Sequence, residues 1–217
     1  MHFGEYELSP SLISLSPLPS AHPEAFQRLL VRTSIWCYPD FILAKGRSLG
    51  GNFIFVGSGT DAWAFDIPSD WITCFLDYCN LFNNNYLFQS KDPSRFLEFI
   101  SHPVMQKSVL CTTIETNVFY PDIVRNAPNT RKRAKAMQKL ASLGMRTYVT
   151  CEPLIKFDLP KMVELIKMCS PVQVNIGKNS RQDITLPEPT KNEVQGLITE
   201  LQKFTKVVVK SNAKCWI

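Results

Sequence analysis

From residue 52 onward, short apolar runs alternate with segments whose apolar residues recur at helical spacing. The apolar runs predict six strands, near residues 52–57, 85–90, 108–115, 146–151, 172–176 and 206–210. The segments between them predict five helices, at residues 67–82, 92–100, 130–144, 159–170 and from 190 onward. Because strand–helix alternation implies parallel pairing and right-handed crossovers, the chain is predicted to be α/β. The pattern leaves open whether the sheet is doubly wound or closes toward a barrel.

Local signals support these helices. Helix caps are expected at Ser69, Asp92, Asp158 and Thr190. Thr190 is followed three residues later by Glu193, a capping-box pattern, and Gly144 suits a left-handed C-terminal cap. The predicted buried stripes consist of Ile72, Phe75, Leu76 and Cys79 in one helix and of Ala134, Met137, Leu140 and Ala141 in another. The strands are apolar throughout, which predicts a sheet covered on both faces.

The first fifty residues follow a different pattern. Residues 11–16 predict one additional strand beside the first, and the rest of this segment is irregular apart from one helical stretch. We expect a single domain over residues 1–217, with a divergent segment at 1–50 and βα repeats at 51–217. The start carries no basic stretch followed by an apolar one, so a cytoplasmic location is expected.

Composition adds few constraints. The net charge of +5 permits an anionic partner without requiring one. The basic run of Arg131, Lys132, Arg133 and Lys135 is interpreted as a solvated helix face. Seven cysteines, an odd number with no C-x-x-C pair, predict reduced thiols. The three histidines are isolated, which disfavours a catalytic triad or a histidine metal site.

Polar residues gather where the predicted strands end. In parallel α/β folds ligands bind at this edge, because the strand-to-helix loops converge there. The candidate ligand-binding residues are Ser58, Thr60, Asp61, Glu115, Glu152, Asn175 and Lys210. Asp61, Glu115 and Glu152 would surround one pocket, and the glycines at 57 and 59 would let backbone approach a ligand. The alternative is that each polar residue serves only its own turn or pairs locally.

Five stretches carry a resemblance to a known group of proteins. They are "NFIFVGSGTDAWAFDIPSDW", "YLFQSKDPSRFLEF", "TTIETN", "VTCEPLIKFDL" and "VQVNIG". Over about residues 50–212 the chain resembles a phage-associated family allied to the radical S-adenosylmethionine (SAM) superfamily and loosely to spore photoproduct lyase. The resemblance implies a partial (β/α)6 TIM-like barrel with a SAM site across its strand ends. By motif position it assigns Thr60 and Asp61 to the SAM amino group, Glu115 to the ribose, and Glu152 and Asn175 to the same pocket.

The chain departs from that superfamily at its iron–sulfur motif. The superfamily holds a [4Fe–4S] cluster with three cysteines spaced C-x-x-x-C-x-x-C, and clusters depend on such thiolates. Here the corresponding segment contains only Cys37, and Leu30 and Ser34 stand at the other two positions. We therefore expect no [4Fe–4S] cluster, with Cys37 a ligand only if one forms.

Three functional hypotheses follow. The first is a phage-derived, radical-SAM-like barrel that has lost its cluster and binds SAM, a nucleotide or a macromolecular partner. The second is a SAM-dependent enzyme with unusual cluster ligation or with carboxylate chemistry. The third is an interaction protein without enzymatic activity, whose partner is a protein or a nucleic acid. None of the three involves a membrane.

Overall fold

The computed structural model describes residues 51–56, 61–120, 127–180 and 184–217. They form one parallel sheet of six strands: β1 (Phe53–Val56), β2 (Asn85–Ser90), β3 (Val109–Thr113), β4 (Arg146–Cys151), β5 (Gln173–Ile176) and β6 (Lys206–Val209). Every neighbouring pair is parallel, and the spatial order is the chain order, β1 to β6. The six predicted strands are therefore confirmed.

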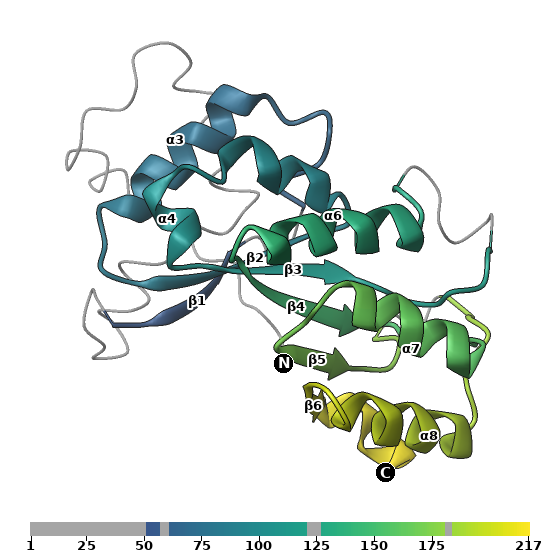
Figure 1. Cartoon of the computed structure of the whole chain (residues 1–217). Coiled ribbons are helices and arrows are strands. Elements are labelled where there is room, and N and C mark those ends of the chain that lie inside the picture. The colour runs from purple at the N-terminus through teal and green to yellow at the C-terminus, as the bar shows by residue number, and fades with distance from the viewer. Residues whose placement is uncertain (1–50, 57–60, 121–126, 181–183) are drawn as a thin grey trace, which may run out of the picture.

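The helices and 3-10 turns occupy the connections between strands. They are α3 (Ser69–Asn80), η2 (Pro93–Phe99), α4 (Pro103–Gln106), α6 (Thr130–Ser142), α7 (Leu159–Met168), α8 (Lys191–Gln202) and the C-terminal η3 (Ser211–Trp216). Helix α6 packs against α7, and α7 packs against α8 (Figure 1).

The strand order decides between the two architectures that the sequence left open. In a doubly wound sheet the order reverses at a switch point, so helices cover both faces. Here the order never reverses, and right-handed crossovers then place the connecting helices on one face. The fold is a parallel half-barrel of the TIM type, with its helices outside (Figure 1). The predicted partial (β/α)6 barrel is confirmed.

The two faces of the sheet differ in composition. Alternate residues on the helix-covered face are buried and apolar, including Ile54, Phe88, Leu110, Val149 and Val174. The opposite, concave face carries a mixture of apolar and polar side chains. At its β1 edge, Phe53 is 56% and Phe55 is 38% exposed, so the prediction that both faces are covered is wrong there.

An aromatic cluster fixes the start of the barrel. Trp63 is 1% exposed, and its ring makes edge contacts with four phenylalanines: Phe75, Phe88, Phe96 and Phe99. Such pairs each add about 0.5–1.5 kcal/mol beyond the apolar area that they bury. The chain therefore enters the core at Trp63, two residues after Asp61.

The predicted caps have mixed outcomes. Asp158 and the Thr190–Glu193 capping box are confirmed, and Gly144 has a φ of 84°. Ser69 is wrong as a cap, because Pro68 holds that position and Ser69 is already the first helical residue. Asp92 precedes η2 without a capping hydrogen bond. The helix predicted at 92–100 is a 3-10 helix, since Pro93 and the aromatic core contacts set its path.

The predicted buried stripes are confirmed for Ile72, Phe75, Leu76, Cys79, Ala134, Met137 and Leu140, whereas Ala141 is half-buried. In the described ranges, no cysteine is in a disulfide, as predicted. Within those ranges no helix has the length and hydropathy needed to cross a bilayer. The strand predicted at 11–16 lies outside the described residues, as do Leu30, Ser34, Cys37, Ser58 and Thr60.

Candidate functional site

The carboxyl ends of the strands form the mouth of the half-barrel. Strand pairing aligns Thr113 with Thr150 and Thr150 with Asn175 on the concave face. Side chains in a strand alternate between faces, and backbone bonds from Ile114 to Thr150 and from Gly177 to Cys151 extend the ladder past the strand ends. Glu115 and Glu152 therefore belong to the next row of the same face, two residues beyond the two threonines.

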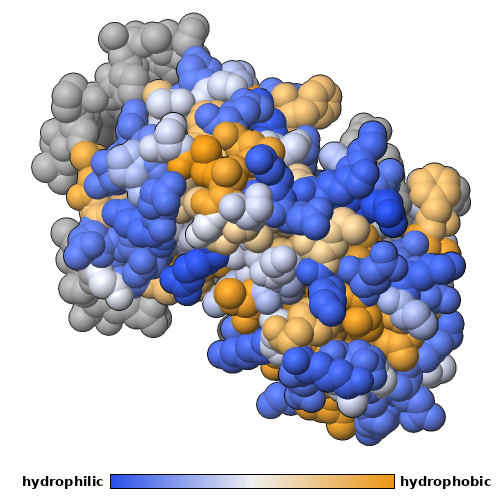
Figure 2. All heavy atoms as spheres, viewed as in Figure 1, coloured by the Kyte–Doolittle hydropathy of each residue, from blue (hydrophilic) through white to orange (hydrophobic). Residues whose placement is uncertain are grey.

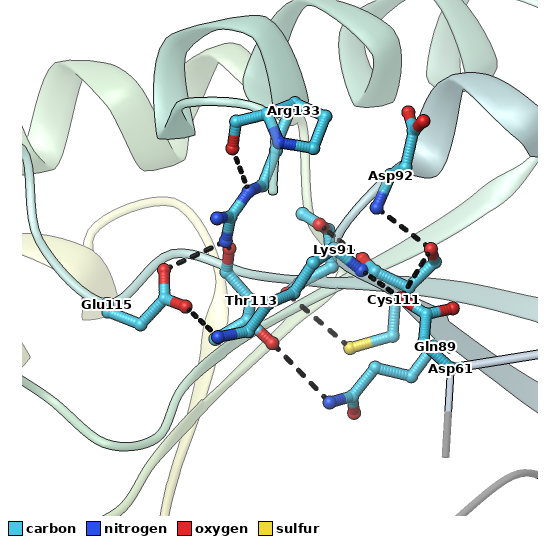
Figure 3. Close-up of polar contacts among 11 residues, drawn as sticks. Asp61, Gln89, Lys91, Asp92, Cys111, Thr113, Glu115 and Arg133 are labelled. Atoms are coloured by element: carbon cyan, nitrogen blue, oxygen red, sulfur yellow. Dashed lines mark hydrogen bonds and ion pairs between the residues drawn. The ribbon is translucent and has the colours of Figure 1, made fainter. Parts of the chain in front are cut away.

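Glu115 lies between two cations. Its Oε2 accepts a hydrogen bond from Arg133 Nη1 at 2.9 Å, and its Oε1 pairs with Lys91 Nζ at 2.6 Å (Figure 3). The carboxylate side chain is 8% exposed and that of Arg133 is 1% exposed. Arg133 also donates to the carbonyl oxygens of Thr113 and Pro128. Arg133 is thus a buried cation that donates to three acceptors, and the prediction that it belongs to a solvated helix face is wrong.

Asp61 joins the same group through backbone contacts. Its carboxylate accepts hydrogen bonds from Trp63 N (3.0 Å), Ser90 Oγ (3.0 Å) and Lys91 N (2.9 Å). These bonds tie the loop after β1 to the end of β2 and hold the backbone of Lys91, whose ammonium group reaches Glu115 (Figure 3). The structure therefore brings Asp61 and Glu115 together through Lys91.

Glu152 belongs to a separate cluster. Its carboxylate pairs with Lys210 Nζ and accepts a hydrogen bond from Asn212 Nδ2 at 3.0 Å. To reach them from β4, the side chain passes over Gly177, which follows β5. A Cβ atom at Gly177 would lie 2.6 Å from Glu152 Oε1, closer than real contacts allow. The absence of a side chain at Gly177 thus permits the Glu152–Lys210 pair.

A row of polar side chains lies on the concave face below these clusters. Thr113 Oγ1 is 3.4 Å from Gln89 Nε2, and Asn175 Oδ1 accepts a bond from Gln173 Nε2 at 2.8 Å. Between them, Thr150 is 4% exposed, and its Oγ1 has no hydrogen-bond partner among the residues that the structure describes. A buried hydroxyl without a partner costs about 1–3 kcal/mol, so an unmet donor and acceptor at this position points to a bound water or ligand.

A hollow of about 310 Å³ opens beside the Glu115 cluster. Its walls come from the end of β3, the segment after it and the first turns of α6, and they include Glu115, Phe119, Tyr120, Arg131, Lys132 and Lys135. Asn129 caps α6 through Lys132 N at 2.9 Å. Of the predicted site residues that the structure describes, only Glu115 borders this cavity, which lies on the helix side of the mouth.

The buried thiols are poor metal ligands. Burial raises the pKa of Cys111 and Cys169 to about 12 and raises that of Cys151 further. Since metals and clusters take the thiolate, these three cysteines are disfavoured as ligands at neutral pH. Across the described part of the chain, no three His, Cys, Asp or Glu side chains lie close enough to hold a metal ion.

Sequence reasoning missed four residues that shape the mouth: Thr113, Arg133, Thr150 and Gly177. Two of them carried a signal, since Thr113 and Thr150 each precede a predicted site glutamate by two residues, the strand period. Arg133 also carried one, because it precedes Met137 and Leu140 at the spacing of the buried stripe. Gly177 had no such local signal.

No model of a protein family matches the chain, and no curated protein matches it. Among solved structures, the chain is similar to a spore photoproduct lyase variant determined with bound AdoMet and a dinucleoside spore photoproduct. The TM-score is 0.49 at 10% identity, over 76% of this chain and 49% of that chain. Similarity at this level identifies neither a family nor an activity.

Proposed function

We propose that the chain is a radical-SAM-like half-barrel whose mouth binds a nucleotide-like ligand such as SAM and holds no [4Fe–4S] cluster. The observation that carries the proposal is Thr150 Oγ1, a buried hydroxyl on the concave face that has no partner in the described ranges. Ligands of parallel α/β barrels bind at this end of the sheet. A ligand hydroxyl or amine in the mouth would satisfy Thr150.

The surrounding side chains suit a ligand of mixed charge. Lys91 and Lys210 are the partners of Glu115 and Glu152, and their side chains are 48% and 45% exposed. Each lysine can therefore turn toward a ligand carboxylate or phosphate without leaving water. The freed glutamate oxygens would accept hydrogen bonds from ribose hydroxyls or an amino group, and Asn175 offers an amide on β5, the strand next to that of Glu152.

The chemistry of the available thiols does not fit an iron–sulfur cluster. Leu30 and Ser34 stand at two of the three expected ligand positions, and neither supplies a thiolate. Of the remaining cysteines, Cys111, Cys151 and Cys169 are held as neutral thiols by burial. The proposal therefore assigns binding to the mouth and no radical step.

Isothermal titration calorimetry with SAM, adenosine and ATP tests the proposal. The informative variant is Thr150→Val, which removes the hydroxyl and keeps the shape. Because Oγ1 makes no hydrogen bond within the described part of the protein, the urea midpoint should stay the same or rise, while ligand affinity falls about tenfold. Thr199→Val is the matched control, since that exposed hydroxyl bonds only to the Gln195 carbonyl of its own helix.

Two results would overturn the proposal. If none of the three ligands binds at millimolar concentration, the mouth is not a nucleotide site. That result would support the hypothesis of an interaction protein without enzymatic activity. If anaerobic purification gives stoichiometric iron and sulfide that are lost in Cys37→Ala, the chain is instead a cluster enzyme with unusual ligation.

A further inference from the structure

Helix α6 carries an uncompensated basic face. Its thirteen residues include five basic residues and no acidic one. Arg133 is buried against Glu115, whereas Arg131, Lys132, Lys135 and Lys139 are exposed. In the described parts of the chain, none of these four forms an ion pair. Other cations do find acids, among them the half-buried Lys156 with Glu193 and the exposed Lys203 with Glu200.

Aromatic side chains lie at the N-terminal end of this face. Phe119 is 73% exposed, and it lines the 310 Å³ hollow together with Tyr120, Arg131, Lys132 and Lys135. The N-terminal end of α6 lies at the edge of the sheet where the strands end (Figure 1). On the face in view the surface around α6 is mostly hydrophilic (Figure 2). A cavity with exposed aromatic and cationic walls thus continues into a line of free positive charge.

We propose that the exposed face of α6 and the hollow at its N-terminal end form a docking surface for single-stranded nucleic acid. Four cations spread along one side of α6, from residue 131 to residue 139, match the repeating charge of a phosphate backbone. An exposed phenylalanine beside a hollow offers a stacking platform for an unpaired base, which a duplex cannot present. Duplex DNA or an acidic protein would use the charges and leave Phe119 without a role.

This inference does not depend on the ligand proposed for the mouth. The docking surface belongs to the exposed face of α6 and to residues 116–120 after β3, and its hollow shares Glu115 with the mouth. Thr150 and Asn175 lie apart from it, on the concave face of the sheet. Binding to α6 can therefore be measured on the full chain without SAM or any nucleotide.

Fluorescence anisotropy with labelled oligo-dT of about 15 nucleotides tests the surface. Lys132→Gln/Lys135→Gln should weaken binding at least tenfold at 50 mM salt and lower the slope of log K against log salt by about 1.4, or about 0.7 per lost contact. Lys206→Gln/Lys214→Gln removes the same charge from exposed positions in and after the last strand and should leave affinity within about twofold. Phe119→Ala should weaken binding about tenfold with an unchanged salt slope.

Three results would overturn the proposal. One is that the protein does not bind oligo-dT at 50 mM salt although a cooperative urea unfolding transition shows that it is folded. Another is equal weakening by the two double variants, which would mean that only net charge matters. The third is a lack of preference for single-stranded nucleic acid. It would show as equal affinity for duplex and single-stranded DNA, or as competition by polyglutamate as effective as that by oligo-dT. Either outcome would leave Phe119 without a function.

Discussion

The two glutamates at the mouth have the same chemistry and the same place in the strand pattern, yet their surroundings differ. Glu115 is 8% exposed and is held by the buried Arg133 as well as by Lys91. Glu152 is 22% exposed and pairs with the exposed Lys210. Breaking a buried pair leaves an uncompensated charge and costs about 3–5 kcal/mol, whereas exposed pairs contribute about 0–1 kcal/mol. Glu115 therefore belongs to the framework of the mouth, and Glu152 is the carboxylate free to respond to a ligand.

The largest expected effect comes from Arg133→Met. The substitution removes the hydrogen bonds to Glu115, Thr113 and Pro128 while keeping an unbranched side chain. The free energy of unfolding should fall by about 3 kcal/mol, measured by urea titration. Arg131→Met, an exposed neighbour on the same helix, should change it by less than about 0.5 kcal/mol. Equal losses of stability in the two variants would mean that the Arg133–Glu115 pair is worth no more than an exposed arginine. Glu115 would then not differ from Glu152 in its structural role.

Gly177→Ala should have the next largest effect, because its methyl group enters the path of the Glu152 side chain. Displacing that flexible side chain forfeits its contacts with Lys210 and Asn212, which should cost about 1 kcal/mol in urea unfolding. In a Glu152→Ala background the cost should nearly vanish, which separates steric displacement from backbone effects. Gly196→Ala in α8, with its nearest neighbour at 3.4 Å, should instead stabilise by about 0.5–1 kcal/mol.

A pH titration measures an exposed pair outside the mouth. The Lys156 ammonium and the Thr190 cap lower the pKa of Glu193 from 4.5 to about 2. The stabilisation is therefore present above about pH 4.5 and lost as the pH falls toward 2. At pH 6, Glu193→Gln should destabilise by about 1 kcal/mol, and the difference from the parent should shrink below pH 3. If the difference in unfolding free energy between the parent and Glu193→Gln stayed constant from pH 6 to below pH 3, the lowered pKa of Glu193 would be contradicted.

The smallest expected effect is that of Glu152→Gln. The exposed pair with Lys210 should contribute about 0.5 kcal/mol or less, so the urea midpoint should hardly move. The same variant should weaken SAM binding if Glu152 accepts a ligand hydroxyl or amine. A loss of stability comparable to that of Arg133→Met would show that both glutamates are structural.

Much of the fold was predictable because its signals are local. The six apolar runs and the capping pattern at Thr190 and Glu193 each depend on a few neighbouring residues. Ser69 failed as a cap because Pro68, just before it, already occupies the capping position. The 3-10 helix at Pro93–Phe99 also escaped prediction, because its path follows contacts with the distant Trp63.

The candidate site was predictable only as a set of polar strand ends. The positions of Asp61, Glu115, Glu152, Asn175 and Lys210 follow from strand alternation and parallel pairing. Their partners do not, since Glu115 pairs with Arg133 eighteen residues away and Glu152 with Lys210 fifty-eight residues away. Neither pairing leaves a periodic trace in the chain.

The sequence by itself determined that this protein is a parallel α/β chain with acids at the carboxyl edge of its sheet, because periodicity and strand alternation are properties of neighbouring residues. Only the tertiary structure decided that the sheet is a half-barrel, that Arg133 is buried and that Gly177 gives Glu152 its route to Lys210. Strand order, burial and side-chain clearance depend on contacts between distant segments, and those exist only once the chain has folded.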